Sequence, residues 1–85
     1  MLIADQLRAA RAMLRMDQSA LAAVSGVSVE TIKRLERMEG PLSGTRVATV
    51  NAIQAALERA GVEFIAENGG GTGVRLKPAK AKRKP

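Results

Sequence analysis

The side chains of this chain that could take part in chemistry are basic, acidic and hydroxylic, because two of the usual reactive types are missing. The 85 residues include no cysteine and no histidine. The chain therefore has no thiolate nucleophile and no disulfide, and it lacks the commonest general base and the commonest transition-metal ligand. The carboxylates form no tight cluster at a spacing that suits a metal ion or acid–base work. We therefore expect no enzyme activity, no cofactor and no metal.

The balance of charge indicates a protein that attracts negatively charged partners rather than one that catalyses a reaction. Fourteen Lys and Arg against eight Asp and Glu give a net charge of +6. Four of the basic residues stand in residues 78–85, which hold no acid, so residues 1–77 carry ten basic and eight acidic groups. The tail is either a solvated, disordered end or a flexible basic arm that attracts phosphate without regard to sequence.

A second group of charges is ordered by helical spacing. If Val27, Ile32 and Leu35 face inward, the outer side of the segment 28–37 carries the following residues: Val29, Glu30, Lys33, Arg34 and Arg37. A basic, solvent-facing helix that projects from a compact core suits the major groove of DNA, which accepts one helix.

Two short helices joined by a tight turn must position this face. Asp17 and Ser28 are good N-caps for helices at about 17–24 and 28–37. Gly26 stands between them and can take the positive φ that ends a helix at low cost. We expect the two helices to pack through their apolar inner faces.

Further elements surround this pair. Apolar spacing predicts helices at about 4–15 and 45–60, the second ended by Gly61. The period then changes to two, which predicts an antiparallel hairpin of strands 62–64 and 74–76. The connection between the strands is long and rich in glycine, so the sequence does not determine the register in which the two strands pair.

The stretch from Gln18 to Glu36, with Ala22, Gly26 and Ile32 at set intervals, resembles the Cro/CI-type (XRE-family) helix-turn-helix repressors. The match covers about residues 4–60, and the end of the chain is similar to the extension of a small bacterial subset. The resemblance implies a mainly α fold: a compact four-helix, lambda-repressor-like helix-turn-helix domain with a C-terminal β-hairpin and a disordered basic tail. The domains expected are 1–61, a hairpin extension at 62–77 and the tail at 78–85.

The resemblance also implies residue roles. Gln18 would touch phosphate or support a base-reading side chain, unless it is an ordinary exposed residue at a helix start. Arg34 would read a base, most naturally guanine, and Lys33 and Arg37 would grip phosphates. Val29 suits a thymine methyl group. The remaining members of the expected DNA-binding set are Ser28, Thr31 and Glu30.

Two acidic residues have competing interpretations. Glu30 could accept from a cytosine amino group or could simply favour the positive end of its helix. Glu36 is the residue that the family typically pairs with an arginine of its first helix, here Arg11. The resemblance therefore implies a structural ion pair between Arg11 and Glu36.

The predicted hairpin bears on whether the protein forms a dimer. An isolated two-stranded ribbon is marginal in water, so it must dock on its own helices or pair with another chain. Pairing is attractive because a two-fold dimer doubles the DNA site. We expect a homodimer with an interface that includes Val62, Phe64, Val74 and Leu76.

The function expected is that of a sequence-specific regulator of transcription, a repressor that binds double-stranded DNA. The alternatives are an antitoxin, which would bind a toxin as well as DNA, and a helix-turn-helix module that binds only proteins. The chain has no apolar run of about 18 residues and no signal peptide. We expect a cytoplasmic, nucleoid-associated protein with no membrane partner.

Overall fold

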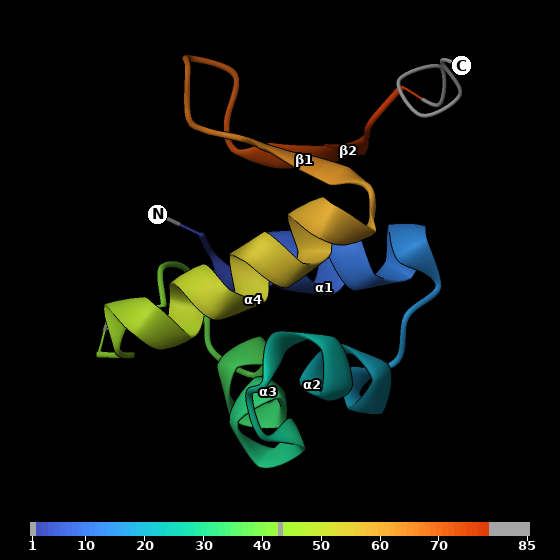
Figure 1. The fold of residues 1–85 in the computed structure, drawn as a ribbon. Helices are drawn as coiled ribbons and strands as arrows, with labels where there is room; N and C mark the ends of the chain where they lie inside the picture. The colour runs from blue at the N-terminus through green and yellow to red at the C-terminus, as the bar shows by residue number, and fades with distance from the viewer. Residues whose placement is uncertain (1, 43, 79–85) are drawn as a thin grey trace.

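The computed structural model describes residues 2–42 and 44–78, and it contains four helices and one hairpin within them (Figure 1). The helices are α1 (Ala4–Leu14), α2 (Gln18–Ser25), α3 (Val29–Glu36) and α4 (Val47–Ala60), and the strands are β1 (Val62–Ile65) and β2 (Gly73–Leu76). Residues 79–85 of the predicted tail lie outside the described residues. The predicted class, a mainly α helix-turn-helix domain with a C-terminal hairpin, is confirmed.

The elements form three layers. Helices α1 and α4 lie in the middle, the hairpin lies on one side of them, and α2 and α3 lie on the other (Figure 1). Side chains from all four helices and from β1 form one core. Its fully buried large side chains are Leu7, Leu21, Ile32, Leu35, Leu42, Ile53, Leu57 and Val62. The α3 helix is therefore fixed by the same core that carries the hairpin.

The predicted helix ends are close to those observed. Each of the two motif helices starts after its predicted cap, at Gln18 and at Val29, and α4 starts two residues later than predicted, at Val47. The reason is that Arg46 still has an extended backbone, with φ −60° and ψ 138°. Arg15 ends α1 in the left-handed region, with φ 55°, which turns the chain toward α2.

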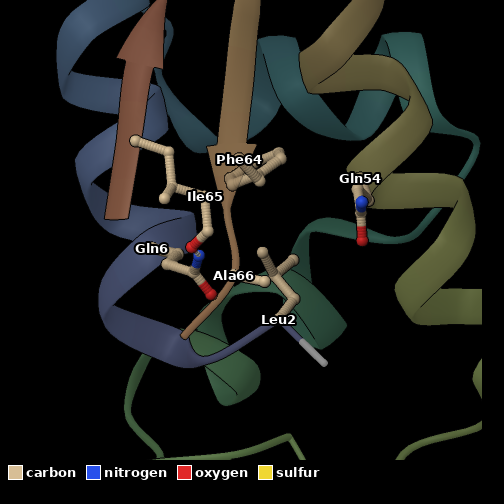
Figure 2. A pocket seen from close by; sticks show the side chains of 6 residues that line it. All are labelled: Leu2, Gln6, Gln54, Phe64, Ile65 and Ala66. Atoms are coloured by element: carbon tan, nitrogen blue, oxygen red, sulfur yellow. Dashed lines mark hydrogen bonds between the residues drawn. The ribbon is translucent and has the colours of Figure 1, made fainter. Parts of the chain in front are cut away.

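The hairpin docks on its own helices. Its strands pair antiparallel in the register Val62↔Leu76 to Ile65↔Gly73, β1 lies against α4, and β2 lies against α1. Gln6 fastens it: its Nε2 donates to the carbonyl oxygens of Gly73 at 2.9 Å and Ile65 at 3.3 Å. A small hollow beside this contact is lined by Leu2, Gln6, Gln54, Phe64, Ile65 and Ala66 and holds no charged side chain (Figure 2).

The four expected interface residues of the hairpin have different surroundings. Val62, one of the residues expected at a dimer interface, is fully buried in the core of its own chain and has no exposed surface for such an interface. Phe64 and Val74 are half-buried against the core, whereas Leu76 is 55% exposed.

Candidate nucleic-acid interface

The turn between α2 and α3 follows from three local residues. Asp17 Oδ1 accepts from the backbone N–H of Ala20 at 2.7 Å, which caps α2. Gly26 ends α2 with φ 76°, where a side chain would be strained although nothing stands within 4 Å of an added Cβ. Ser28 Oγ then accepts from the N–H of Thr31 at 3.2 Å and starts α3. The two predicted caps and the turn glycine are confirmed.

Helix α3 has an apolar inner side and a charged outer side. Ile32 and Leu35 are fully buried. The exposed members of the expected DNA-binding set are Ser28, Glu30, Lys33, Arg34 and Arg37, and the half-buried ones are Gln18, Val29 and Thr31. Val29 on the outer side of α3 is thus only partly exposed, between the exposed side chains of Ser28 and Glu30.

A carboxylate holds the far end of α3 in place. Arg11 of α1 donates from Nε to Glu36 Oε2 at 2.6 Å and from Nη2 to Oε1 at 2.8 Å. Glu36 is only 7% exposed. The structure thus brings together the two residues expected to form the structural ion pair, in the two-pronged geometry that suits Arg and a carboxylate.

The same carboxylate connects the two motif helices. Gln18, the first residue of α2, donates from Nε2 to Glu36 Oε1 at 2.9 Å. Its amide is thereby turned toward α3, the helix that carries the basic face. Arg8 of α1 also donates to the backbone carbonyl of Glu36. Three side chains from α1 and α2 therefore fix the orientation of α3.

The ionisation of Glu36 reflects these contacts. Burial raises the pKa of its carboxyl group, but the hydrogen bonds from Arg11 and Gln18 outweigh it and hold the pKa below the ordinary value of 4.5. The pKa of Arg11 is raised by its hydrogen bond to Glu36. The pair is therefore charged at neutral pH, and it leaves the outer face of α3 free of this acid.

A polar hollow lies between α3 and the start of α4, and sequence reasoning missed most of it. Thr31 and Arg34 line one side, and Thr45, Arg46 and Thr49 line the other. The hydroxyl oxygen of Thr45 is buried and has no hydrogen-bond partner among the described residues. A basic residue beside hydroxyl residues at a helix start, directly after the Gly44 turn, was the signal that could have found these residues.

A family comparison matches this geometry. A family model described as helix-turn-helix matches residues 7–52, more than half of the chain, from within α1 to within α4. The chain belongs to the Cro/CI-type (XRE) helix-turn-helix family. A comparison with curated proteins found no match. This helix-turn-helix protein is thus a DNA-binding regulator, from a family whose members typically are not enzymes.

Among the described residues, this helix-turn-helix protein shows neither a metal-binding cluster nor a membrane-spanning helix. In residues 2–42 and 44–78, no group of three acidic side chains could hold a metal ion. No helix in the same ranges is long and apolar enough to cross a membrane.

Proposed function

We propose that this regulator reads double-stranded DNA by inserting α3 into the major groove. The observation that carries the proposal is the exposure of Lys33, Arg34 and Arg37 on the outer side of a helix whose inner side is buried. The major groove admits a single helix, and a fork of guanidinium donors matches the acceptors of guanine. An exposed basic face on a rigidly held helix meets both requirements.

Within this proposal, the residues divide by their position on the face. Arg34 projects between the outer side of α3 and the hollow shared with α4, and we assign it to a guanine edge. Lys33 and Arg37 carry positive charges on the exposed side of α3, and we assign these charges to contacts with backbone phosphates. The half-buried Val29 and Thr31 and the exposed Glu30 stand near the start of α3, where contacts to bases are closest.

The hollow beside Arg34 supports a phosphate contact at the start of α4. Arg46 adds a positive charge there, and Thr49 adds a hydroxyl donor. Such contacts would position the protein along the groove without specifying sequence.

We further propose that the protein binds as a homodimer and acts as a repressor in the cytoplasm, at the nucleoid. One recognition helix reads only a few base pairs, and a two-fold pair doubles the site. Repression requires only that the operator be occupied, which a groove-reading face can do alone. The proposal predicts a palindromic site with half-sites about one helical turn, roughly 34 Å, apart.

The decisive experiment is a footprint with purified protein at two salt concentrations, followed by single variants. Arg34→Ala should relax the preference at one base pair by about 1–3 kcal/mol, whereas Lys33→Ala should weaken binding to all sequences alike. Arg75→Ala is the matched control, because Arg75 belongs to β2, and the hairpin and α3 lie on opposite sides of the α1–α4 layer (Figure 1).

The outcomes separate the alternatives. A protected palindrome that loses affinity steeply with salt supports groove reading with phosphate contacts. Absence of any protected site, with the fold intact, would contradict the proposal and favour a module that binds only proteins. A footprint that sharpens when a toxin is added would identify an antitoxin, which shares the DNA site proposed here.

A further inference from the structure

The connection between β1 and β2 places an asparagine directly before a glycine. Residues 66–72 form this connection and are all exposed, and Asn68 and Gly69 lie near its centre. We infer that the connection is a modification site, in which Asn68 loses its side-chain amide by cyclising onto the backbone nitrogen of Gly69, with Glu67 as the general base. This reaction is confined to the hairpin and does not depend on how α3 reads DNA.

The attacking nitrogen has free access to the side chain of Asn68. Gly69 has no Cβ to hinder the approach of its nitrogen to Cγ of Asn68. Its φ is 100°, which residues with a side chain rarely adopt, and apart from its chain neighbours no described atom lies within 4 Å of the place where a Cβ would stand. Because the two groups belong to adjacent residues, closure of a succinimide ring is intramolecular.

A carboxylate contacts the proton that must be removed. Glu67 Oε2 accepts from the backbone N–H of Gly69 at 2.9 Å. The same oxygen accepts from the N–H of Gly71 at 3.2 Å, so two hydrogen bonds hold the carboxylate against the connection. A general base must lie within hydrogen-bond reach of the proton that it takes, about 2.6–3.2 Å. Glu67 meets this requirement for the N–H of Gly69.

A backbone donor contacts the amide that is attacked. Asn68 Oδ1 accepts from the N–H of Gly70 at 3.2 Å. Negative charge develops on this oxygen when a nitrogen adds to Cγ, and a hydrogen-bond donor directed at the oxygen stabilises that charge. The base, the electrophile, the nucleophile and the donor therefore come from the consecutive residues 67–70.

The reaction needs only water as a co-reactant. The nitrogen of Gly69 bonds to Cγ of Asn68, and the bond between Cγ and Nδ2 breaks. The proton of Gly69 passes through Glu67 to Nδ2, which leaves as ammonia, and a succinimide ring remains. Water then opens the ring: its hydroxyl joins a carbonyl carbon and its proton returns to the nitrogen of Gly69. Addition at Cγ gives aspartate, and addition at the main-chain carbonyl gives isoaspartate, in which the chain continues through Cγ.

The product alters both the charge and the length of the connection. A neutral amide becomes a carboxylate, which lowers the net charge of the chain from +6 by one and places a second acidic group beside Glu67. Isoaspartate also adds a methylene carbon to the main chain between Glu67 and Gly69, so the spacing of the N–H groups that Glu67 holds changes. The change belongs to the hairpin layer, which α1 and α4 separate from α3 (Figure 1).

The other asparagine of the chain is an internal control. Asn51 is exposed as well, but it lies within α4 and precedes Ala52, whose N–H belongs to the helix ladder and whose Cβ hinders attack. Cleavage after Lys and Arg separates the two sites, since Asn51 falls in residues 47–59 and Asn68 in residues 60–75. When the folded protein is incubated at neutral pH, we expect the 60–75 peptide to gain the mass of deamidation roughly 10²-fold faster than the 47–59 peptide.

Labelled water shows when the reaction occurred. Ring opening inserts an oxygen atom from water, so incubation in water enriched in heavy oxygen, followed by digestion in ordinary water, marks the side chains that reacted before digestion. A circular dichroism spectrum that stays unchanged over the incubation shows that the folded chain was the reactant. The labelled fraction of each peptide then gives the rate at each asparagine.

A second experiment tests the general base. Glu67→Gln keeps an oxygen that can accept from the N–H of Gly69 but removes the carboxylate, and we expect deamidation of Asn68 to slow several-fold. Glu63→Gln is the matched control, because it removes the same charge from the hairpin at a residue of β1 that pairs with Arg75 at 3.0 Å. Its deamidation rate should equal that of the natural protein.

Either of two results would overturn the inference. One is a 60–75 peptide that gains mass no faster than the 47–59 peptide. The other is a rate at Asn68 that Glu67→Gln and Glu63→Gln affect equally. Neither result bears on the DNA proposal, because the connection and α3 lie on opposite sides of the α1–α4 layer (Figure 1).

Discussion

At the scale of single residues, Glu36 determines how α3 is held. Its carboxylate accepts from Arg11 and Gln18, and its side chain is almost inaccessible to solvent. Glu36→Gln removes the charge and leaves Arg11 without its partner. We expect a loss of about 3 kcal/mol in the free energy of unfolding, the lower end of the range for breaking a buried pair.

Urea unfolding measures this loss, and Glu39→Gln is its control. Glu39 is exposed and makes no side-chain hydrogen bond among the described residues, so its change should stay within about 0.5 kcal/mol. Equal stability of the two variants would contradict the structural role of Glu36. DNA affinity should fall in Glu36→Gln only to the extent that the folded fraction falls.

The lowered pKa of Glu36 predicts a pH dependence. Because the hydrogen bonds from Arg11 and Gln18 outweigh burial and keep the folded-state pKa below 4.5, the ionised carboxylate stabilises the fold above that pH. This contribution is lost as the pH falls through the folded-state pKa. The difference in unfolding free energy between the natural protein and Glu36→Gln should therefore narrow between neutral pH and about pH 3. A constant difference over that range would contradict the prediction.

At the scale of elements, Gly26 sets the angle at which α3 leaves α2. Its φ is 76°, and an added Cβ meets nothing within 4 Å, so the cost of Gly26→Ala is conformational alone. We expect a loss of about 1–2 kcal/mol in unfolding free energy. Gly70→Ala is the control, because Gly70 is exposed and does not have a positive φ. Thermal unfolding of the two variants should separate them clearly.

The hairpin depends on one buried amide. Gln6 accepts from the N–H of Ile3 at 3.0 Å and donates to the carbonyls of Gly73 and Ile65. Gln6→Leu would leave these groups unpaired, at a cost of about 1–3 kcal/mol. Amide exchange should accelerate in β1 and β2 more than in α3.

Gln54→Leu tests whether that effect is specific. Gln54 lines the same hollow (Figure 2), but its amide donates to Glu58 Oε2 at 3.1 Å, within α4. The Gln54→Leu variant should leave amide exchange in β1 and β2 close to that of the natural protein. Equal acceleration by both leucine variants would mean that filling the hollow, rather than removing the Gln6 hydrogen bonds, loosens the hairpin.

Local signals in the sequence predicted the motif itself. Asp17, Gly26 and Ser28 act on backbone groups within a few residues of their own positions, so their roles can be inferred without the fold. The alternation of β1 and β2 likewise predicted a hairpin. Arg11 and Glu36 are 25 residues apart, and only the family resemblance related them before the structure brought them together.

Features that depend on distant parts of the chain were not predictable in this way. Gln6 and Gly73 are 67 residues apart, and no periodicity shows that an amide in α1 will bind a strand end. Val62 and Leu76 have the same place in the alternation and stand opposite each other in the hairpin, yet Val62 is fully buried and Leu76 is exposed. The hollow formed by Thr45, Arg46 and Arg34 requires that the α4 start lie beside α3.

At the scale of the whole molecule, charge is distributed unevenly along the chain. Residues 1–77 carry a net charge of +2, and four further basic residues lie in residues 79–85. If that segment binds phosphates, its removal should weaken binding to every DNA sequence by the same factor. The slope of log affinity against log salt should then become less steep by about 0.9 for each phosphate that the segment neutralises.

The base preference distinguishes this effect from groove reading. A chain that ends at Pro78 keeps the three-layer fold with α3 and its hollow, so its preferred operator should be unchanged. Arg34→Ala should instead alter the preference at one position. Binding curves over a salt series, on the operator and on a scrambled duplex, measure both quantities. An unchanged slope would mean that the segment is only solvated, and a changed operator preference would mean that it reads bases.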